Sequence, residues 1–175
     1  MDKKGEIDYL SRIIKPDISV ITNVNYAHAK NFNNINQIAL AKSEIIHNTK
    51  PNGHVVLNAD DAFFKFHKKL ALKNNLKVIS FGIKNKKSNI KFINIRRIKK
   101  IYKINIKIET QKKFFLISNN FQNNIYNILA TLAVMRVYEN IFKLSKNIFL
   151  NFKIPSGRGD YSKIRINNRY INLID

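Results

Sequence analysis

Three polar residues near the start of the chain follow a short apolar run and could carry chemistry. Thr22 ends the run at 17–22, Asn23 comes directly after it, and His28 lies a few residues further on. An imidazole can bind a metal ion or contact a phosphate, although a loop histidine also serves simply by bonding to backbone. Ligands of open α/β sheets bind beyond the carboxyl ends of strands, so these residues are candidates for a ligand cleft.

Lys42 lies on the apolar face of a predicted helix. The other residues of that face are Ile38, Ala39, Ile45 and Ile46. An ammonium there is unfavourable unless its stem snorkels to solvent or its charge is paired. Snorkelling is the simpler interpretation of the pattern alone. Because an ammonium repels a magnesium ion, a metal-binding role would require this amine to be converted into an anion.

Two acidic residues and one arginine occupy similar positions later in the chain. Asp60 and Asp61 follow the second apolar run, where they could cap the next helix at its N-terminus or contact a nucleotide. Arg158 follows Pro155 in a Pro-Ser-Gly-Arg-Gly turn. Its guanidinium could hold a phosphate in a fork geometry or could be one surface cation among many.

Apolar runs and helical repeats alternate over the first half of the chain. The pattern predicts strands at 17–22, 54–58 and 77–82 and helices at 35–46 and 62–72. A strand, helix, strand order requires crossover connections and produces a parallel sheet. The predicted fold class is therefore α/β, a mostly parallel sheet with flanking helices.

The second half has a different texture. Alternating apolar and polar residues at 89–118 predict antiparallel strands, which form a small β appendage with one wet face. A strong amphipathic helix is predicted at 123–137 and a shorter helix around 144–150. The Pro155 turn marks a boundary, and 161–175 resembles two strands around a turn.

Composition limits the class of protein. The chain has 175 residues and 45% hydrophobic content, which argues against disorder. It has no cysteine, so disulfides and thiolate metal sites are excluded and a reducing, cytoplasmic location is expected. No apolar run approaches the roughly 18 residues of a transmembrane helix, and the charged N-terminus does not resemble a secretion signal.

The chain is strongly basic. Lys and Arg outnumber Asp and Glu by 32 to 11, for a net charge of +21. Taken alone this indicates a nucleic-acid-binding protein, and the segment 84–113, with Phe92 and Tyr102 among its cations, favours that alternative. The basic residues are nevertheless spread over the whole chain together with an excess of Ile and Asn, as AT-rich codons produce. We therefore expect an anionic small-molecule substrate and no specific nucleic acid.

In their order and spacing, these segments resemble the Mur ligase family. The resemblance is strongest to the members that add D-alanyl-D-alanine to a UDP-muramoyl tripeptide. The matching residues are Gly5-Glu6-Ile7, Pro16-Asp17, Ile21-Thr22-Asn23-Val24 with Ala27-His28, the segment from Ile38 to Ile45, Asn58-Ala59-Asp60-Asp61, Asn124 with Asn127, and Gly157-Arg158. They span essentially the whole chain, and their order carries more weight than any single motif.

The resemblance implies an ATP-dependent amide ligase with ATP and Mg²⁺ as cofactors. Its substrates would be UDP-MurNAc-tripeptide, whose carboxylate ATP phosphorylates, and D-Ala-D-Ala, whose amine attacks the acyl phosphate. Lys42, carbamylated by carbon dioxide, and His28 are the implied catalytic residues and metal ligands. Thr22 and Asn23 would line the substrate end. The implied nucleotide contacts are Asn124 and Asn127 at the adenine, Arg158 at the phosphates, and Asp60 and Asp61.

The chain also departs from the family pattern. The family's phosphate-binding Gly-x-x-Gly-Lys-[Ser/Thr] motif does not occur in it. We therefore expect a fragment, with 1–154 forming most of the central ATP-binding domain and 155–175 beginning the C-terminal domain. Such a fragment should be inactive alone, and the full-length protein should be a monomer without membrane association.

Smaller departures affect the site itself. Asn25 stands where the family usually has Gly, and Asn123 where it commonly has His. Lys30 stands where Glu is frequent, which reverses a charge near His28. A sister ligase that adds a different amino acid, or a folate-type ligase of the same superfamily, is the remaining alternative.

Overall fold

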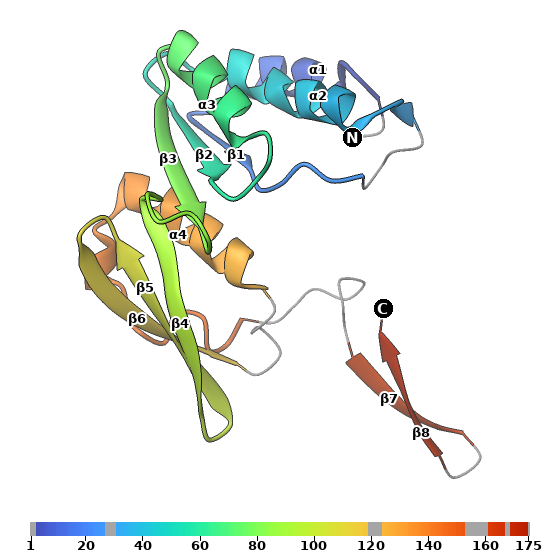
Figure 1. The fold of residues 1–175 in the computed structure, drawn as a ribbon, viewed down its shortest axis with the longest axis vertical. Coiled ribbons are helices and arrows are strands. Elements are labelled where there is room, and N and C mark those ends of the chain that lie inside the picture. Colours follow the sequence, from blue (N-terminus) through green and yellow to red (C-terminus); the bar gives the residue numbers. More distant parts are fainter. Residues whose placement is uncertain (1–2, 27–30, 119–123, 153–160, 167–168, 175) are drawn as a thin grey trace.

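A computed structural model describes residues 3–26, 31–118, 124–152, 161–166 and 169–174 (Figure 1). Six strands form one sheet in the order β1-β2-β3-β4-β5-β6, and a separate two-stranded sheet consists of β7 and β8. The predicted α/β class is confirmed. The first three strands are parallel and the last three form an antiparallel meander.

The parallel half follows the predicted alternation of strands and helices. Its elements are α1 (Glu6–Ile14), β1 (Ile18–Ile21), α2 (Ile35–His47), β2 (His54–Asn58), α3 (Phe64–Lys73) and β3 (Lys77–Gly82). Since β1, β2 and β3 are parallel, their carboxyl ends at Ile21, Asn58 and Gly82 lie at one edge of the sheet. That edge positions Thr22, Asn23 and the two aspartates that follow β2.

Strand β2 shows why this half of the sheet is covered on both faces. Val55 and Leu57 pack in a cluster with Ile46 of α2 and Ala71 of α3. Val56, which points to the other face, packs in the cluster that contains α4 (Ile125–Tyr138). The buried β-branched run therefore requires helices on both sides, and Figure 1 shows α1–α3 on one side and α4 on the other.

The antiparallel half continues the same sheet. Its strands are β4 (Ile90–Ile98), β5 (Ile101–Ile108) and β6 (Gln111–Ser118), and β4 joins β3 through a short parallel pairing. Ile104, Ile106 and Phe115 are fully buried in the cluster that contains α4. The predicted β appendage is thus the extension of the main sheet, with one face packed and the other wet.

Helix α1 is not among the predicted elements. Several of its apolar side chains are exposed to solvent, so the helix buries few apolar residues on one face. Its start at Gly5 adopts a left-handed backbone (φ 89°). The Glu44 carboxylate, from α2, accepts hydrogen bonds from the backbone N–H of Gly5 at 2.9 Å and of Asp8 at 3.0 Å. A cap supplied by such a distant residue leaves little local signal.

The predicted helix at 144–150 is wrong. A 3₁₀ helix, η3 (Ile141–Lys143), is followed by turns. The Lys113 ammonium donates to the carbonyl oxygens of Ile141 at 2.8 Å, Phe142 at 2.7 Å and Leu144 at 2.6 Å. The Lys146 carbonyl oxygen accepts from the backbone N–H of Leu116 in β6 at 2.8 Å, and Phe149 forms a bridge with Ile117, so the segment packs along the sheet instead.

The C-terminal part contains the two predicted strands, β7 (Tyr161–Ile166) and β8 (Arg169–Ile174), which pair antiparallel. The predicted domain boundary at 155 falls within 153–160, outside the described residues. The division into 1–154 and 155–175 stays a prediction. Among the described residues, no helix combines the length and the apolar character needed to cross a bilayer.

Candidate functional site

Lys42 reaches from α2 to the end of β1. Its ammonium donates to the backbone carbonyl oxygen of Asn23 at 2.7 Å, and the side chain is partly buried. The pKa of Lys42 lies below its ordinary value because burial removes water from the ammonium, while the Asp61 carboxylate opposes part of that shift. The lysine is therefore tied to the strand end through an exposed hydrogen bond, while its stem is partly buried.

A small hollow adjoins Lys42. Its volume is about 160 Å³, and its lining consists of Ile7, Val20, Ile21, Thr22, Lys42 and Ile45. The structure thus brings together Thr22 and Lys42, which the sequence pattern assigned to a strand end and to a helix face. The side chains of Thr22 and Asn23 are exposed at this edge, where a ligand could reach them.

Two bonds tie the loop after β1 to the loop after β2. Asn58 donates through its side-chain amide to the carbonyl of Thr22 at 3.0 Å, and Asp61 accepts from the backbone N–H of Val24 at 2.7 Å. The second Asp61 oxygen accepts from the N–H of Phe63 at 2.8 Å, in the turn before α3. Asn58 is 92% buried and acts as a brace. The motif Asn58-Ala59-Asp60-Asp61 was recognised, but the contact of Asn58 with Thr22 was not predicted because the two are 36 residues apart.

Asp60 has a different environment from Asp61. Its carboxylate accepts hydrogen bonds from the backbone N–H groups of Ile83, Lys84 (3.0 Å) and Asn85 (2.7 Å), and from the Tyr126 hydroxyl at 3.1 Å. None of these donors belongs to α3, so Asp60 does not cap the helix that follows it. The predicted capping role is wrong for this residue.

These hydrogen bonds make the contribution of Asp60 to the stability of the fold depend on pH. Burial raises its pKa, but the bonds from Lys84, Ile83, Asn85 and Tyr126 outweigh burial and leave the pKa below the ordinary value of 3.8. The unfolded chain then binds more protons than the folded chain, so the stabilisation is complete above the ordinary pKa and is lost as the pH falls through the folded pKa.

We expect the difference in unfolding free energy between the unaltered chain and Asp60→Asn to be largest at neutral pH. It should shrink as the pH falls below about 4. Urea unfolding at a series of pH values measures this difference, and taking it between two variants cancels the titration of the other carboxylates. A difference that stays constant down to strongly acidic pH would contradict the assignment of these bonds to an ionised Asp60.

The first turn of α4 contains the two predicted adenine contacts. Asn124 directly precedes the helix and Asn127 lies one turn later, exposed to solvent. The Asn127 side-chain amide donates to the Asn124 side-chain oxygen at 3.2 Å, so the two carboxamides lie together. Their contact with a nucleotide stays a prediction.

His28 and Arg158 lie outside the described residues, so the pairing of His28 with Lys42 and the phosphate contact of Arg158 stay predictions. A different histidine lies near Lys42. His67, in α3, is 98% buried, and its Nε2 is 3.1 Å from the carbonyl oxygen of Ala39 in α2. Burial and the Lys42 ammonium lower the pKa of His67 more than Ala39 and Asp61 raise it, so the pKa lies below its ordinary value. The sequence offered only a helix-face histidine, which gave no functional signal.

Within the part of the chain that the structure describes, the unmodified residues do not fit a magnesium ion. Among the described residues, no group of three or more His, Cys, Asp or Glu side chains could hold a metal. Lys42 is an ammonium, and both oxygens of Asp61 already accept backbone bonds. Mg²⁺ prefers oxygen ligands, which this edge offers only after the amine is converted to an anion.

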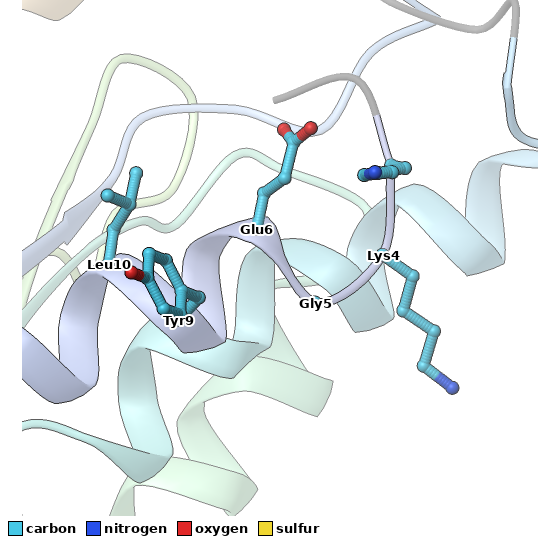
Figure 2. A pocket seen from close by; sticks show the side chains of 6 residues that line it. Lys4, Gly5, Glu6, Tyr9 and Leu10 are labelled. Carbon is cyan, nitrogen blue, oxygen red and sulfur yellow. The ribbon is translucent and has the colours of Figure 1, made fainter.

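A second hollow lies at the start of α1. Its volume is about 500 Å³, and its lining consists of Lys3, Lys4, Gly5, Glu6, Tyr9 and Leu10. Figure 2 shows Glu6, Tyr9 and Leu10 projecting from the helix, with Lys4 on the segment before it. It shares no lining residue with the hollow around Lys42, so it is a separate feature of α1.

Comparison with known proteins gives a consistent set of relatives. The UDP-N-acetylmuramoyl-tripeptide--D-alanyl-D-alanine ligase of Buchnera aphidicola subsp. Acyrthosiphon pisum is 42% identical over 95 residues, which cover 54% of this chain and 20% of that protein. The ligase of the same name from Rickettsia prowazekii is 27% identical over 98% of this chain and 38% of its own length. The chain thus spans between about a fifth and two fifths of these relatives.

Two solved structures that share the fold are MurF ligases. MurF from Acinetobacter baumannii superimposes with a TM-score of 0.80 at 21% identity, over 98% of this chain and 36% of that one. MurF from Thermotoga maritima, solved in complex with ADP, gives a TM-score of 0.75 at 24% identity, over 92% of this chain and 36% of that one. Residues 1–135 match the Mur ligase middle domain. The chain therefore belongs to the Mur ligase family.

Proposed function

We propose that the chain is part of the ATP-dependent ligase that joins D-Ala-D-Ala to UDP-MurNAc-tripeptide in peptidoglycan precursor synthesis. The observation that carries the proposal is the alignment with the Rickettsia prowazekii ligase over 98% of the chain. The geometry supports it, since the edge where the parallel strands end brings together Lys42, Asn23 and Asp61. Ligand sites of α/β sheets lie at such edges.

The reaction implied for this ligase has two steps. The tripeptide carboxylate attacks the γ-phosphoryl group of ATP, which releases ADP and leaves an acyl phosphate. The amine of D-Ala-D-Ala then attacks the acyl carbon, an amide bond forms, and inorganic phosphate departs. Thr22 and Asn23, exposed beside Lys42, line the substrate end in this proposal, and the carboxamides of Asn124 and Asn127 bind the adenine.

Lys42 is proposed to react with carbon dioxide. The neutral amine forms an N–C bond and loses a proton, which gives a carbamate anion. Only the unprotonated amine is nucleophilic, so the lowered pKa of Lys42 supports this chemistry. The carbamate would change the local charge from positive to negative and, with His28, supply ligands for Mg²⁺. When bound, that ion would neutralise charge on the phosphoryl group being transferred.

A chimera tests the proposal. The matching segment of the Rickettsia prowazekii ligase is replaced by residues 1–175, and ADP release is measured with ATP, UDP-MurNAc-tripeptide and D-Ala-D-Ala. We expect release that requires all three substrates. A chimera that folds and binds the tripeptide nucleotide, but releases no ADP with the dipeptide, would contradict the proposal. Activity with a single amino acid in place of D-Ala-D-Ala would instead indicate a sister ligase.

The nucleic-acid alternative is separated by a binding measurement. Between residues 62 and 108 the chain has no acidic residue, which makes weak electrostatic binding to any polyanion expected. For a ligase, binding to random RNA should be micromolar or weaker and should vanish on modest addition of salt. Tight binding that persists at physiological salt would favour a nucleic-acid-binding protein.

A further inference from the structure

The Asp60 carboxylate joins three segments that are far apart in the sequence. Asp60 itself follows β2, Ile83, Lys84 and Asn85 belong to the loop after β3, and Tyr126 lies in the first turn of α4. The three loop residues donate through their backbone N–H groups and Tyr126 donates through its hydroxyl, which gives four hydrogen bonds to the carboxylate. Ile83, Lys84 and Tyr126 donate to Oδ2 and Asn85 donates to Oδ1, so protein groups hold both oxygens in place. We call the four bonds the Asp60 clamp.

The loop after β3 is shaped to fit around this carboxylate. A Cβ atom added at Gly82 would lie 3.1 Å from both Asp60 oxygens and 2.9 Å from the Ser88 hydroxyl oxygen. The side-chain amide of Asn85 donates back to the carbonyl of Ala59 at 3.2 Å, which closes the loop onto the residue before Asp60. A side chain at position 82 would therefore require the Asp60 and Ser88 side chains to shift.

Tyr126 is the residue through which the Asp60 clamp contacts α4. Its position in the chain lies between Asn124 and Asn127, so its side chain sets the rotation of the turn that contains both carboxamides. No side-chain hydrogen bond caps the start of α4. The buried residues Ile128 and Leu129 fix the helix as a whole, and the hydrogen bond from Tyr126 to Asp60 ties its first turn to the loop after β2.

We propose that Asp60 is a positioning residue for the adenine end of the site. Through Tyr126 it holds the first turn of α4, so that the Asn124 and Asn127 carboxamides are preorganised for a purine base. This rests on the proposed function, in which those carboxamides bind the nucleotide. Burial and the neighbouring carboxylate raise the pKa of Tyr126, which keeps its hydroxyl protonated as a donor.

The test uses the chimeric ligase that carries residues 1–175, with ADP as the probe. Tyr126→Phe removes one hydroxyl from the clamp and leaves the ring in place. Tyr138→Phe is the matched control, because Tyr138 is 72% exposed at the other end of the same helix. Both variants are compared with the unaltered chain by calorimetric titration and by the nitrogen-15 resonances of the Asn124 and Asn127 side-chain amides, at a temperature where all three are fully folded.

In Tyr126→Phe we expect the dissociation constant for ADP to rise about tenfold, the size expected for losing one hydrogen bond to a charged group. We also expect the Asn124 and Asn127 side-chain resonances to shift in that variant. In Tyr138→Phe, neither the dissociation constant nor these resonances should change. A role confined to stability would leave the affinity of the folded chain unchanged. Equal ADP affinity in Tyr126→Phe and the unaltered chain would therefore overturn the positioning role while leaving the proposed function intact.

The failure of the proposed function has a different signature. If ADP does not bind the chimera with unaltered residues 1–175, or binds without changing the Asn124 and Asn127 resonances, the adenine assignment fails. In that case, the asparagine side-chain resonances of Tyr126→Phe, recorded without ligand, test whether the clamp orients the first turn of α4. Unchanged asparagine resonances in Tyr126→Phe would show that Asp60 does not control this turn.

Discussion

Replacing Lys42 by alanine in the chimeric ligase should lower kcat about a thousandfold, the upper range for loss of a group that stabilises charge in a transition state. The physical reason is that this residue supplies the anion proposed at the end of β1, and alanine can neither form a carbamate nor reach the strand end. ADP release at saturating substrates measures the change. The lost bond to the Asn23 carbonyl should cost only about 1 kcal/mol, so the protein should still fold.

Two further variants separate the carbamate from the cation. Lys42→Arg keeps a positive charge but cannot react with carbon dioxide, and we expect it to lose as much activity as Lys42→Ala. Lys73→Ala removes an exposed lysine from the last turn of α3 and should leave kcat unchanged. Full activity in Lys42→Arg would show that the site needs a cation at this position and would contradict the carbamate.

Replacing Phe115 by alanine should lower the free energy of unfolding of the chain by about 3–5 kcal/mol, because the substitution leaves a cavity that the core fills only in part. Phe115 is fully buried in β6 and meets Phe149 edge to face, with ring centroids 5.5 Å apart. That contact joins the sheet to the segment after η3. Urea unfolding followed by circular dichroism measures the loss.

Phe66 provides the control for this substitution. It lies in α3 with 40% of its surface exposed, so Phe66→Ala should change stability by about 1 kcal/mol or less. Similar losses for Phe115→Ala and Phe66→Ala would mean that the cluster around α4 is not the principal core of the chain.

Local patterns were sufficient for most of the fold. The β-branched run of β2 and the helical repeat of α2 are each read within a few residues, because burial on both faces of a strand and on one face of a helix leaves a periodic signature. Helix α1 and the segment at 144–150 depend on Glu44 and Lys113 respectively, which bond to them from other elements. Hydrogen bonds from distant residues cannot be predicted from the local sequence of the segment that receives them.

The same distinction holds for the site. The common edge of Thr22, Asn23 and the two aspartates followed from strand order, because parallel strands end at one edge. The place of Lys42 in the site was implied only by the family resemblance. The hydrogen bonds of Asn58, His67 and Tyr126 could not be predicted from local patterns, since each joins the residue to a partner at least 28 residues away. Asp60 was recognised as a residue at a strand end, but its bonding partners could be identified only once the loop after β3 and α4 had been brought to it.

The ligase assignment is tested most directly by the chemical state of Lys42. The chain is incubated with carbon-13 bicarbonate, ADP and magnesium, and carbon-13 spectra are recorded for the unaltered protein and for Lys42→Arg. The account predicts one carbamate resonance that Lys42→Arg lacks. A Lys42 that remains an unmodified amine under these conditions, with no such resonance in the unaltered chain, would contradict it.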